Sequence, residues 1–167
     1  EYRLKLIDIY SMMNDRESIE RHLRVLSKDL KRVVRIGEAL KRAGMTDVLR
    51  ELAEDEATNS LRLNRGLLTH QTINQIGCMI KKLIELEEKA AAKKVFESLN
   101  TTIDSLMSID KLTEVMNACE FAAIVAQLDG TEAAKELLSE AISNALRVKR
   151  GKFELLCHVA RASCKLG

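Results

Sequence analysis

Apolar residues recur at intervals of three or four along most of the chain, which is the spacing of one face of an α-helix. The clearest stretch covers residues 118–141, where Phe121 and Val125 belong to one apolar stripe and Leu138 belongs to a second. Gly130 separates the two stripes and can close a helix by adopting a left-handed backbone. This stretch therefore predicts an antiparallel helical hairpin with a tight turn.

The same spacing predicts about eight helices in all. We expect them over residues 1–13, 16–43, 46–63, 73–86, 90–107, 112–128, 131–148 and 153–165. The apolar stripe of the helix from 16 to 43 continues without a breaker to Gly44, and this helix would be roughly 40 Å long. The turn at 87–89 lacks Gly and is the least marked boundary, whereas the hydroxyl of Thr131 is expected to cap the helix that follows it.

Two pairs of segments align without a gap and indicate an internal repeat. Residues 86–99 match residues 128–141, and residues 118–129 match residues 156–167, which gives a period of about 38 to 42 residues. We expect one all-helical domain over 1–167, with divergent helices over 1–66 and clearer hairpins over 67–167. The chain begins without Met and stops just past an expected helix end, which is compatible with a piece of a longer repeat protein.

The repeated positions carry residue types that also suggest a family. They are a small residue in the first helix, a turn Gly or Asp seven residues later, and an Ala followed by a large apolar residue in the second helix: Gly37, Ala122 and Ala160; Gly44, Asp129 and Gly167; Ala92 with Phe96, and Ala134 with Leu138. In these residues the chain resembles the tetratricopeptide (TPR)-like family of helical-hairpin repeats. The resemblance implies antiparallel hairpins stacked as a right-handed α-solenoid. It also implies a groove lined by the first helix of each hairpin, which binds peptides or proteins without catalysis.

Composition supports an all-α chain and narrows its chemistry. There is no Pro among the 167 residues, which suits a chain made of helices and short turns. Because there is also no Trp, the hydrophobic 46% of the residues must form a mainly aliphatic core that includes the methionines. A net charge of +2 implies no polyanionic partner by itself, and no apolar run is long enough to cross a membrane. We therefore expect a cytoplasmic protein without a membrane partner. The four cysteines lack the paired spacings of zinc sites and are expected to be free, buried thiols.

Two groups of cations are the most conspicuous polar patterns. The first group follows one side of the helix expected at 16–43, opposite its leucine stripe, and consists of Arg21, Arg24, Lys28, Lys31, Arg32 and Arg35. The second group surrounds the turn before the last helix and consists of Arg147, Lys149, Arg150 and Lys152. Such groups are usually solvated helix faces or complements to a helix C-terminus. The alternative is a surface for nucleic acid or an acidic partner. The near absence of aromatic residues argues against single-stranded nucleic acid.

Residues for catalysis, cofactor binding or metal binding are not recognisable in the pattern. His22, His70 and His158 have no acidic or nucleophilic partner at a known spacing, and no Gly-rich loop could hold a phosphate. We therefore expect a non-catalytic scaffold that binds another protein or a peptide and needs no cofactor. Two alternatives stay open: a nucleic-acid-binding module that uses the basic face around residues 21–35, and a homo-oligomerising helical bundle.

Overall fold

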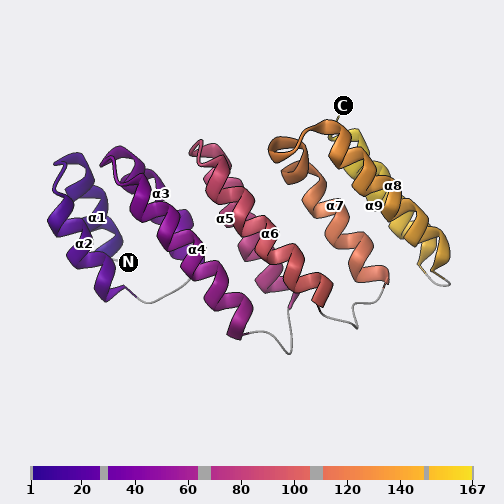
Figure 1. Ribbon diagram of the computed structural model, residues 1–167, viewed down its shortest axis with the longest axis horizontal. Coiled ribbons are helices and arrows are strands. Elements are labelled where there is room, and N and C mark those ends of the chain that lie inside the picture. The colour runs from indigo at the N-terminus through magenta and orange to yellow at the C-terminus, as the bar shows by residue number, and fades with distance from the viewer. Residues whose placement is uncertain (1, 27–29, 64–68, 106–110, 149–150, 167) are drawn as a thin grey trace. The chain divides into compact units, whose positions relative to one another are not determined.

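The computed structural model describes residues 2–26, 30–63, 69–105, 111–148 and 151–166, and every regular element within them is an α-helix (Figure 1). These residues form nine helices: α1 (Tyr2–Met12), α2 (Arg16–Val25), α3 (Leu30–Arg42), α4 (Thr46–Leu63), α5 (His70–Glu85), α6 (Lys89–Ser105), α7 (Lys111–Leu128), α8 (Thr131–Arg147) and α9 (Lys152–Cys164). The helices belong to two compact units, Glu1–Asp104 and Ser105–Gly167. The all-α prediction is confirmed, with one helix more than expected.

The additional helix arises because the long helix expected from 16 to 43 is two helices, and that prediction was wrong. Helix α2 ends at Val25, and Leu26 has an extended backbone with φ −73° and ψ 140°. Both α2 and α3 pack against α1. A straight helix 40 Å long could not double back onto α1, whereas two shorter helices bury Ile19 on α2 and Val33 on α3.

Helices α1, α3 and α5 end in the same backbone motif. The motif places Asn14, Gly44 and Glu87 in the left-handed region, with φ values of 56°, 67° and 64°. In each case the next residue donates its N–H to the carbonyl oxygen five residues back, as in a Schellman motif: Asp15 to Tyr10, Met45 to Leu40 and Glu88 to Leu83. The turn predicted at 87–89 is therefore confirmed, although it contains no glycine.

Replacing Glu87 with glycine is expected to raise the free energy of unfolding by about 0.5–1 kcal/mol, because glycine takes a left-handed conformation without steric cost. The substitution removes the 2.9 Å ion pair between Glu87 Oε2 and Lys41 Nζ, but Glu87 is 86% exposed and such pairs contribute little. Urea denaturation measures the change. The matched control, Gly44→Ala, should be destabilised by about 1 kcal/mol. A Glu87→Gly protein less stable than wild type would show that the Lys41 contact outweighs the backbone strain.

The six helices of the first unit form two layers. Helix α3 contacts both α1 and α5, and α4 packs on α3 (Figure 1). On the other layer, Arg16 of α2 pairs with Asp47 of α4 at 3.1 Å, and Glu54 of α4 pairs with Lys94 of α6 at 3.1 Å. The first layer thus holds α1, α3 and α5, and the second holds α2, α4 and α6.

The core of the first unit is aliphatic, as composition indicated. Leu40, Leu49, Ile76 and Leu83 are fully buried. Gly37 is buried on α3 beside the C-terminal end of α5, and an added Cβ would lie 2.7 Å from Leu86 Cδ1. A small residue is therefore required at this position.

The second unit contains the hairpin that the sequence marked most clearly. Helices α7, α8 and α9 contact one another pairwise around an apolar cluster that includes Ala122 and Leu138, so the predicted stripes are confirmed. The prediction that Thr131 caps α8 was wrong. Gly130, with φ 98°, is the N-cap and makes no side-chain bond, because α8 already begins at Thr131.

Several sulfur-containing side chains lie on the surface rather than in the core. All four cysteines are free, as expected, but Cys78 and Cys164 are exposed, and Cys119 and Cys157 are partly exposed. Met12 and Met13 are each 67% exposed, so they do not fill the core. Helical periodicity identifies an apolar face but does not show whether another helix covers it. Among the described helices, none is long and apolar enough to span a bilayer.

Candidate interaction grooves

The first predicted group of cations is divided between two helices. Arg21 and Arg24 belong to α2, whereas Lys31 and Arg35 belong to α3, and the side chains of these four residues are exposed. Arg21 forms a 2.9 Å ion pair with Glu17 on its own helix. Lys28 and the side chain of Arg32 lie outside the described part of the chain. The extended backbone at Leu26 therefore removes the single helical face on which these cations were expected to align.

The second group of cations flanks the connection between α8 and α9. Arg147 is exposed in the last turn of α8, where it complements the negative end of the helix dipole. Lys152 is exposed at the first position of α9, where the dipole does not favour a cation. Lys149 and Arg150 lie outside the described residues. The helix dipole therefore accounts for the position of Arg147 but not for that of Lys152.

A groove with an apolar floor runs between α2 and α4. We call it the α2–α4 groove; it has a volume of about 260 Å³ and is lined by Leu23, Arg24, Leu26, Val48, Glu51, Leu52, Asp55 and Glu56. Leu23 is buried, while Leu26, Val48 and Leu52 remain partly accessible. The accessible aliphatic surface could accept apolar side chains of another molecule.

Charge on the walls of the α2–α4 groove is predominantly negative. Glu51 and Asp55 lie one helical turn apart on α4, and both are exposed. Neither carboxylate has an ion-pair partner within the described ranges. Arg24 on the α2 side is the one cation among the described lining residues. Two exposed carboxylates facing a single guanidinium favour a cationic group on anything that binds there.

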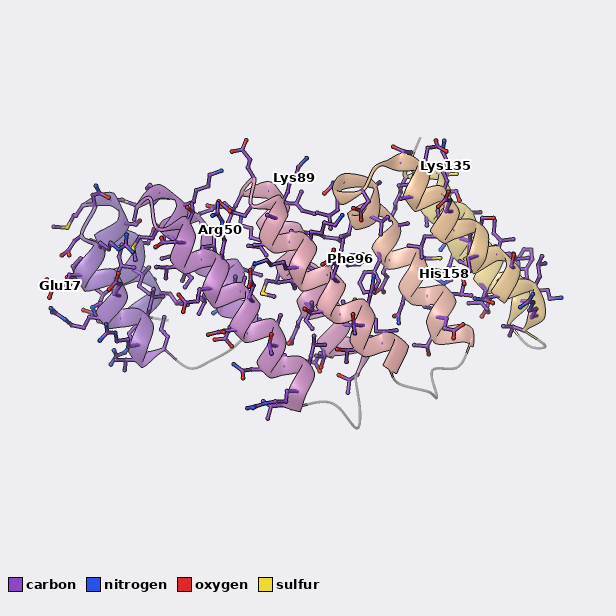
Figure 2. All side chains as sticks on the ribbon, in the orientation of Figure 1. Glu17, Arg50, Lys89, Phe96, Lys135 and His158 are labelled. Atoms are coloured by element: carbon purple, nitrogen blue, oxygen red, sulfur yellow. The ribbon has the colours of Figure 1, made fainter. Side chains whose placement is uncertain are left out.

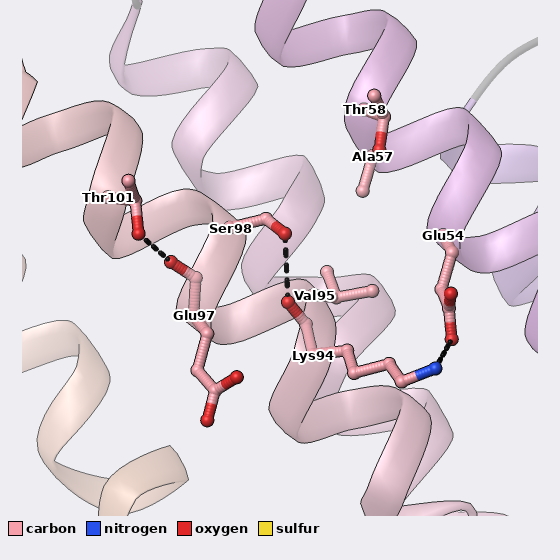
Figure 3. Close-up of a pocket in the computed structure, with 8 residues that line it drawn as sticks. All are labelled: Glu54, Ala57, Thr58, Lys94, Val95, Glu97, Ser98 and Thr101. Atoms are coloured by element: carbon pink, nitrogen blue, oxygen red, sulfur yellow. Dashed lines mark hydrogen bonds and ion pairs between the residues drawn. The ribbon is translucent and has the colours of Figure 1, made fainter.

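A second, more polar groove lies between α4 and α6. This α4–α6 groove has a volume of about 590 Å³ and is lined by Glu54, Ala57, Thr58, Lys94, Val95, Glu97, Ser98 and Thr101 (Figure 3). The ion pair between Lys94 Nζ and Glu54 Oε1 spans it at 3.1 Å. Ser98 Oγ donates to the Lys94 carbonyl at 3.0 Å, and Thr101 Oγ1 donates to the Glu97 carbonyl at 2.8 Å. The hydroxyl protons are therefore committed within α6, and the oxygens remain as acceptors.

Helix α4 contributes a wall to both grooves, so both lie on the layer of second helices. The family resemblance implied a groove on the first helices instead, the layer of α1, α3 and α5. Our sequence reasoning also missed Glu51 and Asp55, because it searched for cations. The signal was present, since Asp47, Glu51 and Asp55 recur every fourth residue and must share one face of a helix.

Side chains suited to metal binding or nucleophilic chemistry do not gather in the part of the chain that the structure describes. No group of three or more His, Cys, Asp and Glu side chains there could hold a metal ion. Burial and the nearby Glu120 raise the pKa of the Cys119 thiol, which disfavours the reactive thiolate. Tyr10 and His22 stack with ring centroids 5.5 Å apart, a packing contact between α1 and α2.

Comparisons with protein-family models, curated proteins and solved structures found no match. The chemistry of the grooves is therefore the basis for a functional proposal.

Proposed function

We propose that this chain is a non-catalytic protein-interaction scaffold, built from stacked hairpins in the manner of a TPR-like right-handed α-solenoid. Three features support the stacking. Helices α1, α3 and α5 follow one another in contact, each ends in the same Schellman motif, and their partners α2, α4 and α6 form the other layer. Three of the five described residues with positive φ, Gly44, Glu87 and Gly130, lie 43 positions apart, close to the period that the sequence indicated, whereas Asn14 lies 30 positions before Gly44.

The α2–α4 groove is the observation that carries the binding proposal. Its floor offers the aliphatic side chains of Leu26, Val48 and Leu52, and its α4 wall offers the carboxylates of Glu51 and Asp55. A partner segment that matches it places apolar side chains on the floor and a Lys or Arg beside the carboxylates. An amphipathic helix lying in the groove satisfies both requirements.

Selection from a random peptide library displayed on phage, with the whole chain as bait, tests this proposal. We expect enriched peptides to combine apolar residues with Lys or Arg and to bind the Glu51→Lys/Asp55→Lys protein at least tenfold more weakly. Both substituted positions are exposed, so the fold should persist. The control, Leu63→Lys, replaces an 80% exposed residue at the end of α4 and should leave binding unchanged. Enrichment of acidic peptides, or equal binding to the double variant, would contradict the proposal.

Nucleic-acid binding through the basic residues has less support. Its cations were expected on one helical face, and the structure divides them between α2 and α3. If nucleic acid bound there, the logarithm of the association constant would fall with the logarithm of salt concentration by about one unit per phosphate contacted. We expect no salt-dependent binding of this kind.

A further inference from the structure

The α2 wall of the α2–α4 groove carries a cation that its own helix does not neutralise. Arg16 pairs with Glu20 at 3.0 Å, and Arg21 pairs with Glu17 at 2.9 Å, so both acidic side chains of α2 are already engaged. Arg24 is exposed, lines the groove and makes no ion pair within the described residues. Its guanidinium is therefore available to another molecule.

The α4 wall carries two carboxylates in the same condition. Arg50 precedes Glu51 in the sequence but donates to Glu88 at 2.5 Å, so it does not neutralise its neighbour. Glu51 and Asp55 are both exposed and have no ion-pair partner in the part of the chain that the structure describes. The lining of the groove thus keeps one guanidinium and two carboxylates unpaired.

The unpaired charges of opposite sign lie on opposite walls. Arg24 belongs to α2, whereas Glu51 and Asp55 belong to α4, and the aliphatic floor of the groove is made by residues of both walls. The guanidinium forms no ion pair with either carboxylate, so the two walls do not neutralise each other across the groove. A molecule on the floor therefore meets a positive wall on one side and a negative wall on the other.

This arrangement restricts the amphipathic helix that fits the groove. A helix that rests its apolar stripe on the floor turns one flank toward each wall. Lys or Arg is favoured on the flank beside Glu51 and Asp55, but on the other flank it would face Arg24, and like charges repel. An Asp or Glu on that second flank would instead accept hydrogen bonds from the guanidinium.

We propose that Arg24 is a specificity determinant of the α2–α4 groove, which selects helices that are basic on one flank and acidic on the other and rejects helices that are basic on both. The inference rests on the proposed function, because it requires a helix in this groove. Exposed charge pairs add little to affinity, so the effect of Arg24 lies mainly in the choice between partners.

Parallel selections from the random peptide library test which flank charges the groove accepts. The baits are the wild-type chain, Arg24→Glu and the matched control Arg35→Glu, which reverses an exposed cation outside the groove. Peptides from wild type and Arg35→Glu should carry acidic and basic residues on opposite sides of their apolar stripe. Peptides from Arg24→Glu should be basic on both sides, because both walls are then negative.

A charge exchange tests the contact of Arg24 itself. In a synthetic peptide from the wild-type selection, the acidic flank residue is replaced by lysine, and both peptides are titrated against wild type and Arg24→Glu. The lysine peptide should bind wild type at least threefold more weakly than its parent and should recover that loss on Arg24→Glu. Arg24 is exposed, so the variant should fold. Equal binding of both peptides to wild type, or no recovery on the variant, would overturn the role of Arg24.

The results separate this inference from the proposed function. If wild type and Arg24→Glu enrich the same peptides, and these peptides still bind Glu51→Lys/Asp55→Lys at least tenfold more weakly, Arg24 does not select partners and the binding proposal stands. If the enriched peptides bind the double variant as tightly as wild type, the groove is not their site and both proposals are wrong.

Discussion

Replacing Gly37 with leucine is expected to lower the free energy of unfolding by about 3 kcal/mol or more. Gly37 is buried in α3, and an added Cβ would lie 2.7 Å from Leu86 Cδ1. A leucine adds three further carbons to this crowded position between α3 and the end of α5. Because the neighbouring aliphatic side chains are themselves buried, they cannot move aside without displacing one helix from the other.

Gly37→Ala is the matched control, because the added methyl group can be accommodated if only the tip of the Leu86 side chain moves. The better helix propensity of alanine, up to about 1 kcal/mol, offsets much of that cost, so we expect stability within about 1 kcal/mol of wild type. Urea denaturation followed by circular dichroism measures both proteins, and hydrogen exchange of α3 and α5 amides localises the loss. Equal stability of the two variants would show that α3 and α5 do not meet closely at Gly37.

Removing the guanidinium of Arg50 is the second large effect that we expect: Arg50→Ala should lower the free energy of unfolding clearly more than the removal of an exposed ion pair does. Arg50 on α4 (Figure 2) donates from Nε to Glu88 Oε2 at 2.5 Å. The Glu88 side chain is only 8% exposed, so the substitution leaves a nearly buried carboxylate without its cation. The loss should stay below that of a fully buried pair, because the Arg50 side chain itself is 52% exposed.

A second ion pair of α4 provides the control for Arg50. Lys94 on α6 pairs with Glu54 on α4, whereas Glu88 is the residue just before α6, and the Lys94 and Glu54 side chains are 66% and 38% exposed. Lys94→Ala should therefore cost about 0.5 kcal/mol or less. Adding Glu88→Gln to Arg50→Ala should recover part of the lost stability, because the buried group is then neutral. Equal losses for Arg50→Ala and Lys94→Ala in urea denaturation would contradict a special role for the buried carboxylate.

Sequence pattern located most helices well where a turn residue agreed with the end of an apolar stripe. Helix α4 was expected over 46–63 and has these bounds, because Gly44 closes the helix before it and Asp47 favours the N-terminal turn. The turn at Glu87 was harder to recognise, since glutamate rarely adopts a left-handed conformation. The packing of α5 on α3, together with the contact between Glu87 and Lys41, outweighs that local preference.

The break after Val25 could not be read from periodicity, because the apolar spacing continues across it at Leu26 and Leu30. The available signal was the presence of Ser27 and Asp29, residue types that favour helix starts. The break also divides the predicted basic face, because it places Arg24 on α2 and Arg35 on α3. The exposure of Met12 and the presence of the α2–α4 groove beside Glu51 also depend on which helix faces are covered by other helices. The apolar pattern of a single helix does not specify this.

Affinity capture from an extract of the source cells, with and without nuclease treatment, tests the scaffold proposal most directly. The baits are the wild-type chain, the Glu51→Lys/Asp55→Lys variant and Arg35→Glu, which changes an exposed cation outside the α2–α4 groove. Our account predicts a protein retained by wild type and Arg35→Glu but lost from the double variant, with no effect of nuclease. Bound material that disappears with nuclease or with Arg35→Glu, or that the double variant still retains, would contradict it.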